Sequence, residues 1–209
     1  MCRVRLFFME LCIIVNKQDK KVSGEQDFEI SKNGLIKKYT GAETAVVIPQ
    51  EICKIAVRSI GKYAFTRKGL ASIVIQNGVT RIGYGAFSHN QLTKAAIPDS
   101  VREIGMGAFC GNQLAGITIP NSVTQIVREA FAGNQLTAVV IPHSVTKIDV
   151  WAFTDNRLKS ITILGTVSLP RKSKYSSSAF DNGFDDFYKS NNKKSGTYLF
   201  DGTNWEYQR

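Results

Sequence analysis

The stretch GNQLTAVVIPHSVTKIDVWAF, from Gly133 to Phe153, nearly repeats the stretch before it, GNQLAGITIPNSVTQIVREAF, from Gly111 to Phe131. An alanine and phenylalanine pair recurs every 22 residues, and an asparagine recurs at the same step. The phenylalanines are Phe65, Phe87, Phe109, Phe131 and Phe153, and the asparagines are Asn90, Asn112, Asn134 and Asn156. A period in this range with fixed apolar positions is typical of a solenoid, because no single unit can bury its apolar face alone.

Each unit follows the pattern N-x-L-x-x-V-x-I-P-x-S-V-x-x-I-x-x-x-A-F. The alternation in AVVIP predicts a strand, since inward residues recur at every second position, and the proline ends it because it has no N–H to donate. The segment Gly105 to Phe109 has room for one helical or 3₁₀ turn, which would place the phenylalanine in the core. We expect the asparagine after this turn to adopt left-handed backbone geometry and to bond free backbone groups.

These residues resemble a known family. The pattern L-x-x-V-x-I-P-x-S-V-x-x-I-G-x-x-A-F is similar to the leucine-rich repeats of the BspA-like family, the Treponema pallidum type, and the match runs from Val47 to Leu164. Asparagine stands where many members have cysteine. The resemblance implies an α/β repeat fold, a right-handed leucine-rich repeat solenoid with a short strand plus a short helical turn per 22-residue unit and with terminal caps.

The sequence outside the repeats predicts the ends of this solenoid. The N-terminus has basic residues before an apolar run, as in a secretory signal, but Glu10 interrupts the run, no A-x-A site follows and the run is too short to span a bilayer. Near the C-terminus, aromatic residues share one helical face: Phe180, Phe184, Phe187 and Tyr188. We expect a signal or disordered segment over 1–27, a hairpin cap over 28–46 that turns at Asn33-Gly34, about five repeats over 47–164, and a helix-plus-hairpin cap over 165–209.

Composition limits the class of protein. The 209 residues are 43% hydrophobic, which suffices for one sizeable core, and the formal net charge is +10. Such a charge favours anionic partners through salt-sensitive attraction, or it serves only solubility. The basic residues fall on turns and ends, at Arg81, Arg102, Arg128, Lys147, Arg157 and Lys159 and in IKKY, RKSK and NNKK. The cysteines, Cys2, Cys12, Cys53 and Cys110, have unrelated spacings, which indicates free thiols and neither a zinc site nor a disulfide framework.

Residue types that often carry catalysis are better explained by local structure. His89 and His143 occupy different positions of the repeat, so a shared metal site or catalytic pair is not expected. Ser144 and its equivalents Ser100 and Ser122 suit turn hydroxyls that bond local backbone, because no base recurs beside them.

Two further motifs are also better explained by local structure than by a functional site. GMGAFCG, from Gly105 to Gly111, has the wrong spacing for a phosphate-binding loop. Asp185 and Asp186 are adjacent on a helix, where side chains diverge, so they suit a solvated helix face rather than an acid and base pair. We therefore expect no catalytic residue, no metal site and no cofactor, and a protein that is not an enzyme.

What remains is the surface. The outward strand positions form a shallow face with little charge, on the sheet side that repeat proteins commonly use for large partners. They are Ser72, Val74, Lys94, Ala96, Gly116, Thr118, Ala138, Val140, Ser160 and Thr162. The resemblance implies a bacterial surface or secreted protein that binds host proteins such as extracellular matrix components, or mediates adhesion, with a monomer favoured. Two alternatives are a basic scaffold for polyanions, such as glycans or nucleic acid, and a cytoplasmic protein-interaction module.

Overall fold

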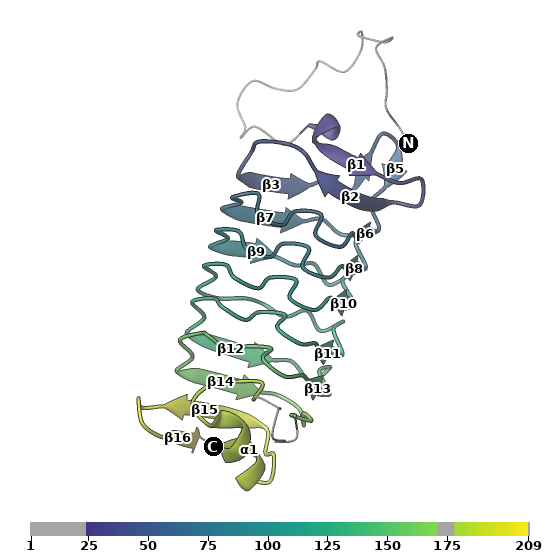
Figure 1. Ribbon diagram of the computed structural model, residues 1–209. Helices are drawn as coiled ribbons and strands as arrows, with labels where there is room; N and C mark the ends of the chain where they lie inside the picture. The colour runs from purple at the N-terminus through teal and green to yellow at the C-terminus, as the bar shows by residue number, and fades with distance from the viewer. Residues whose placement is uncertain (1–23, 171–177, 209) are drawn as a thin grey trace, which may run out of the picture.

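The chain coils into a column of stacked turns, with the N-terminal region at one end and the C-terminal helix and hairpin at the other (Figure 1). A computed structural model describes residues 24–170 and 178–208. Each turn has three sides, which we name the long-strand side, the short-strand side and the phenylalanine-turn side. Most of the predicted signal segment, residues 1–23, lies outside the described residues, as does RKSK at 171–174.

The long-strand side carries one strand from most turns, aligned in parallel at the 22-residue step. Ser72 pairs with Lys94, and Ala138 pairs with Ser160. The inward residues, such as Ile73 and Ile141, are buried, which confirms the predicted alternation. The strands are β3 (Ala45–Ile48), β7 (Ser72–Ile75), β9 (Lys94–Ala96), β12 (Ala138–Ile141) and β14 (Ser160–Ile163).

The short-strand side carries two-residue strands, each ending on a buried isoleucine. They are β6 (Ser59–Ile60), β8 (Arg81–Ile82), β10 (Glu103–Ile104), β11 (Gln125–Ile126) and β13 (Lys147–Ile148). The first three continue a sheet that begins with the N-terminal hairpin, in the order β1-β2-β6-β8-β10. The pairs β6–β8, β8–β10 and β11–β13 are parallel and in register at the 22-residue step.

A column of aromatic rings runs through the core. Successive phenylalanine rings from Phe65 to Phe153 lie 5.0 to 5.7 Å apart between centroids and are stacked. Tyr39 continues the column at one end, 5.2 Å from Phe65, and Phe180 continues it at the other, 5.0 Å from Phe153. Each such pair contributes about 0.5–1.5 kcal/mol beyond its buried area. Phe180 therefore belongs to the column and precedes the helix on which the sequence pattern placed it.

The segment before each phenylalanine is not a helical turn. In Gly105 to Cys110 the Ala108 N–H donates to the Gly105 carbonyl at 3.1 Å, and the Cys110 N–H donates to the Gly107 carbonyl at 3.1 Å. Gly107 lies between the two turns with a φ of 60°. A left-handed residue cannot continue a right-handed helix, so the chain makes two successive turns instead. The phenylalanine is still fully buried, as predicted.

The repeated asparagine is buried at Asn90, Asn112 and Asn134 and partly buried at Asn156, and it bonds backbone groups of its own turn and of the preceding turn. Asn112 Nδ2 donates to the carbonyls of Phe87 and Phe109, both at 3.0 Å, and its Oδ1 accepts from the Leu92 N–H at 3.1 Å. The predicted backbone bonding is thus confirmed, but the predicted left-handed geometry is wrong by one residue. The residue before each asparagine adopts it, namely His89, Gly111, Gly133 or Asp155. The asparagine itself must face inward to reach the free carbonyls.

Both strand sides are interrupted at the same turn. The strand expected around Gly116 and Thr118 is absent, and β9 is not paired with β12 among the described strands. Gly116 has no side chain to pack, and the preceding turn has Ala95 at an inward position where β7 carries an isoleucine. On the short-strand side, β10 and β11 are likewise not paired with each other within the described residues.

Glycine explains where the short-strand ladder breaks. A Cβ on Gly83 would lie 2.8 Å from the Gly61 carbonyl carbon, and one on Gly105 would lie 2.6 Å from the Gly83 carbonyl carbon. Successive turns approach this closely only without side chains. Val127 is the first residue with a Cβ in the series, so its turn must shift away from Gly105. Asp149 then follows the new path, and its N–H again donates to the Ile126 carbonyl at 2.9 Å.

The N-terminal hairpin turns where the sequence predicted. The 3₁₀ helix η1 (Glu25–Asp27) leads into β1 (Phe28–Ile30), which pairs antiparallel with β2 (Leu35–Tyr39), and Gly34 has a φ of 80° in the turn. The first unit is longer than the others, because Ala45 pairs with Ser72, 27 residues on, whereas Ser72 pairs with Lys94, 22 residues on. Within it, β4 (Glu51–Ile52) and β5 (Ile55–Ala56) form a second small hairpin.

The C-terminal region adds a helix and a hairpin to the last turns. The helix is α1 (Phe184–Ser190), and the hairpin strands are β15 (Gly196–Phe200) and β16 (Trp205–Gln208). The β15 strand pairs antiparallel with β14. Phe184 lies within 5.3 Å of Phe180, Tyr198 and Trp205, ring to ring, so one residue ties the helix and the hairpin to the aromatic column.

Candidate functional site

The outward strand positions form the face predicted from the sequence. None of the ten residues is buried, and Val140 is 51% exposed. The face continues onto the hairpin, because Ser160 pairs with Leu199 and the hydroxyls of Thr162 and Thr197 lie 3.0 Å apart. Its outward orientation is therefore observed, while its use for binding stays a prediction. We call this surface the strand face.

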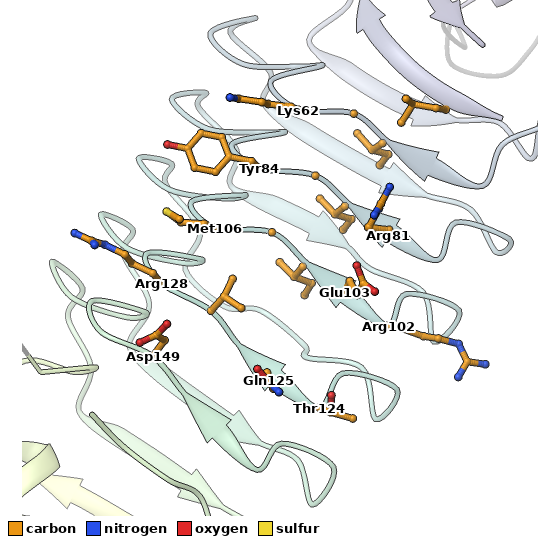
Figure 2. A pocket seen from close by; sticks show the side chains of 18 residues that line it. Lys62, Arg81, Tyr84, Arg102, Glu103, Met106, Thr124, Gln125, Arg128 and Asp149 are labelled. Atoms are coloured by element: carbon orange, nitrogen blue, oxygen red, sulfur yellow. The ribbon is translucent and has the colours of Figure 1, made fainter. Parts of the chain in front are cut away.

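A groove of about 880 Å³ lies on the short-strand side (Figure 2). Its floor is the backbone of the glycine series, Gly61, Gly83 and Gly105, followed by Val127. One rim carries the residue after each of these, which gives the row Lys62, Tyr84, Met106 and Arg128. The other rim carries Arg81, Glu103 and Gln125, with Arg102 and Thr124 at its outer edge.

Cations and aromatic rings pair along the first rim. The Lys62 Nζ lies 5.2 Å from the Tyr63 ring centroid and 5.1 Å from that of Tyr84, and the two tyrosines meet edge to face at 5.0 Å. At the other end, the Arg128 guanidinium lies 4.0 Å from the Trp151 ring. Contacts of this kind contribute about 0.5–1 kcal/mol each at exposed sites, so they hold these side chains in place on the surface.

Several side chains beside this rim stand at left-handed backbone positions. Tyr63, Glu129 and Trp151 have φ of 55°, 57° and 59°, whereas the equivalent residues of two other turns are Gly85 and Gly107. Glycine adopts this geometry without strain, and other residues do so at a cost of about 1 kcal/mol or more. Two of the three residues that bear this cost are aromatic, and both contact the rim.

Sequence reasoning found three basic residues of the groove but missed Lys62 and the aromatic and sulfur side chains. Arg81, Arg102 and Arg128 were placed on turns, and all three line the groove. The others, Lys147, Arg157 and Lys159, are exposed elsewhere. The signal for the missed residues was a shared position in the repeat, the residue after I-G, which is Lys62, Tyr84 and Met106 in successive turns. The residue type at this position differs from turn to turn.

Residues considered for catalysis occupy structural positions. His89 and His143 are both exposed, and the described residues contain no group of three His, Cys, Asp or Glu side chains that could hold a metal ion. Ser100 Oγ donates to the Val79 carbonyl at 2.8 Å, as expected for a turn hydroxyl. The expectation fails for Ser144, whose Oγ is buried without a hydrogen-bond partner among the described residues.

Asp185 departs from the predicted solvated face. It is only 2% exposed, and its carboxylate accepts hydrogen bonds from the N–H groups of Ala179 at 2.9 Å and Phe180 at 3.2 Å. Burial raises the pKa of Asp185, although these two bonds act in the opposite direction. Asp186 is exposed, as predicted. Asp185 therefore secures the chain between the last ring of the column and α1.

The glycines of GMGAFCG serve the stacking of turns, which supports their interpretation as repeat residues. Burial raises the pKa of the Cys110 thiol, and neither Cys110 nor Cys53 forms a disulfide within the described part of the chain. Cys2 and Cys12 lie outside it. Over the same residues, the structure has no helix both long enough and apolar enough to cross a bilayer.

Comparison with solved structures identifies similar folds. The leucine-rich repeat protein of T. pallidum is 30% identical over 68% of this chain and 71% of its own, with a TM-score of 0.62. The pneumococcal vaccine antigen PcpA is 26% identical over 57% of this chain and 30% of its own, with a TM-score of 0.50. A leucine-rich repeat protein of Eubacterium ventriosum is 22% identical over 64% of this chain and 40% of its own, with a TM-score of 0.52, which shows the fold alone.

The chain spans less than half the length of the last two proteins. A comparison with curated proteins found no match. The BspA-type leucine-rich repeat region matches six copies over residues 58–184, which is more than half of the chain. The repeated glycine, asparagine and phenylalanine positions described above all fall within this range. The chain therefore belongs to the BspA-type leucine-rich repeat family.

Proposed function

We propose that the chain is a non-enzymatic protein-binding module of a bacterial surface or secreted protein, and that it attaches to a host matrix protein through the strand face. The observation that carries this proposal is the exposed row of small and β-branched side chains on a hydrogen-bonded ladder. Val74 and Val140 are exposed, and Lys94 is the only charge among the ten positions of the face. Such a surface buries apolar area on binding without desolvating many charges.

The comparisons support this proposal at the level of the family. Solenoid repeats generally present extended surfaces to large partners. A pneumococcal vaccine antigen is among the similar structures, which favours a location outside the cell. Fold alone does not fix function, so the surface itself has to be tested.

The test is binding of the purified chain to immobilised fibronectin and fibrinogen across a salt series. We expect saturable binding that survives physiological salt and that Val140→Glu and Thr118→Glu each weaken by about tenfold or more, because each places a charge on an apolar contact. Lys159→Glu serves as the control, since Lys159 is exposed beside the face and outside its ten positions. Binding that ignores the two strand-face variants would contradict the use of this face.

A second candidate function is attachment to polyanions, which the net charge of +10 and the basic residues of the groove favour. Binding to heparin or DNA would then fall steeply with salt and respond to loss of Arg81 and Arg102 rather than to changes on the strand face. Detection of the native protein only in the cytosol would contradict a surface location and favour an intracellular interaction module.

A further inference from the structure

We propose that the groove on the short-strand side is a second contact surface, which binds an extended protein segment that carries acidic and apolar side chains. The inference rests on the proposed function only in taking the partner to be a protein. It concerns a different side of the column from the strand face and different residues. It therefore predicts that the two surfaces can be disabled separately.

The residue types along the groove are those of protein contacts. Tyrosine, tryptophan, methionine and arginine are enriched in protein interfaces and supply most of the residues that dominate binding energy. Tyr63 is 45% exposed, and Tyr84 and Met106 are each 39% exposed, so apolar surface is available without any rearrangement. The methionine adapts to different partner shapes because its side chain is flexible and polarizable.

The charges of the groove select an acidic segment. Four cations line it, Lys62, Arg81, Arg102 and Arg128, against two carboxylates, Glu103 and Asp149. Arg128 is already paired with Glu129, whereas neither Arg81 nor Arg102 has an ion-pair partner among the described residues. These two guanidinium groups are therefore available for carboxylates of a partner, which arginine binds in a bidentate manner.

The shape of the groove favours an extended chain. Its rims are rows of equivalent residues from successive turns, so it runs along the axis of the column and crosses the turns of Lys62, Tyr84, Met106 and Arg128 (Figure 2). The two paired steps, β6 to β8 and β8 to β10, span about 10 Å, and the unpaired step to β11 adds to this, so the groove can hold at least about three residues of extended chain.

The strained residues of the rim point to the same place. Tyr63 and Trp151 occupy left-handed positions where other turns have glycine, and each holds a cation–aromatic cluster at one end of the groove. A cost of this kind persists where the side chain is needed, and the turn itself does not need it, because Gly85 and Gly107 make the same turn.

Methionine methyl NMR tests the location directly. The chain has three methionines, and Met106 is the one on the groove, so a Met106→Leu variant assigns its signal. The probe is a synthetic peptide in which glutamate alternates with leucine and phenylalanine, and its control has lysine in place of glutamate. We expect the acidic peptide to shift the Met106 signal saturably and the basic peptide to leave it unchanged. A Met106 signal that neither peptide moves would overturn the inference.

Charge reversal tests the role of the two arginines. In a fluorescence anisotropy titration, the double variant Arg81→Glu and Arg102→Glu should bind the acidic peptide about tenfold or more weakly than the unchanged chain. The double variant Arg157→Glu and Lys159→Glu changes the net charge equally outside the groove and outside the strand face, and it should bind as before. If both double variants bind the acidic peptide equally weakly, net charge alone explains the effect and the inference fails. Circular dichroism shows whether each variant remains folded.

Two further outcomes keep the proposals apart. A heparin oligosaccharide that displaces the acidic peptide and shifts Met106 more strongly would make the groove a polyanion site and overturn a protein partner. If the chain does not bind matrix proteins but its Val140→Glu variant still binds the peptide, the proposed function is wrong and this inference stands. Matrix binding that depends on Val140, together with no effect of the peptide on Met106, would sink this inference alone.

Discussion

The phenylalanine-turn side and the short-strand side are made by the same repeat, yet only the first is continuous from end to end. On the phenylalanine-turn side, stacked rings, buried amides and backbone bonds all connect the turns: each unit supplies the same ring, the units from Phe87 to Phe153 supply the same amide, and the Phe109 N–H donates to the Ala130 carbonyl of the next turn. On the short-strand side, backbone groups connect the turns, and their spacing depends on whether a residue has a Cβ. The ladder breaks between β10 and β11, where Val127 interrupts the glycine series. On this side a change of residue type coincides with a break between turns, whereas the ring column runs through the same turns unbroken.

The largest effect should come from breaking the continuous side at Phe109. Its ring is fully buried and stacks on Phe87 at 5.2 Å and on Phe131 at 5.7 Å. Phe109→Ala should lower the free energy of unfolding by about 3–5 kcal/mol, because it leaves a cavity between two rings. Urea denaturation measures the loss. Met106→Ala, in the same turn but on the surface, is the control and should cost less than about 1 kcal/mol.

Removal of one buried amide should have the next largest effect. Asn112→Ala would leave the Phe87 and Phe109 carbonyls and the Leu92 N–H without their partner. We expect a loss of about 1–3 kcal/mol in unfolding free energy. Asn121→Ala removes the same amide from an exposed turn of the same unit and should change little. Equal losses of unfolding free energy in the two variants would contradict a stabilising role of the buried asparagines.

A gain in stability is expected where the turn carries strain. Glu129 has a φ of 57° and a partly exposed ion pair with Arg128. Glu129→Gly should stabilise the chain by about 0.5–1 kcal/mol, because relief of backbone strain exceeds the small worth of an exposed pair. Gly107→Ala makes the reverse change at a φ of 60° where a Cβ has room, and it should destabilise by about 1 kcal/mol. Thermal unfolding of both variants checks the signs.

The smallest effect on stability, but the sharpest on structure, is expected from Val127→Gly. It extends the glycine series, so β10 and β11 should pair and the residue 127 amide should bond the Ile104 carbonyl, as Gly105 bonds Ile82. Hydrogen exchange at that amide should slow after correction for its intrinsic rate. Asp149→Gly is the control, because its strand is already paired with β11. Unchanged exchange at residue 127 would show that the side chain does not cause the break.

Most of the fold could be predicted because the same apolar residue types recur at each core position of successive units. The inward alternation, the buried phenylalanines and both terminal hairpins follow from local patterns such as Asn33-Gly34. The position of the left-handed residue could not be fixed, because asparagine and its neighbour are both compatible with it. The ladders are interrupted around Gly116 and Val127, and the packing of one turn on the turn before it is not visible in the sequence of a single unit.

The two surfaces differ in the same way. The strand face could be predicted, because alternation alone says which side chains of Ala138 to Ile141 point outward. The groove could not, because its rims combine rows from two sides of the repeat and its key residues do not repeat. Tyr84, Met106 and Arg128 occupy one row with three different chemistries. A search for periodic residues passes over such positions.

The aromatic column has a consequence for how the length of this protein can change. Tyr39 and Phe180 meet the outermost phenylalanines in nearly the geometry that the phenylalanines use with one another. A chain that gained or lost one whole unit would present the same ring to each end region. The length of the column can thus be altered in steps of one turn, about 4.8 Å where strands pair. The number of repeat units can therefore vary while the two end regions keep the same contact with the outermost ring.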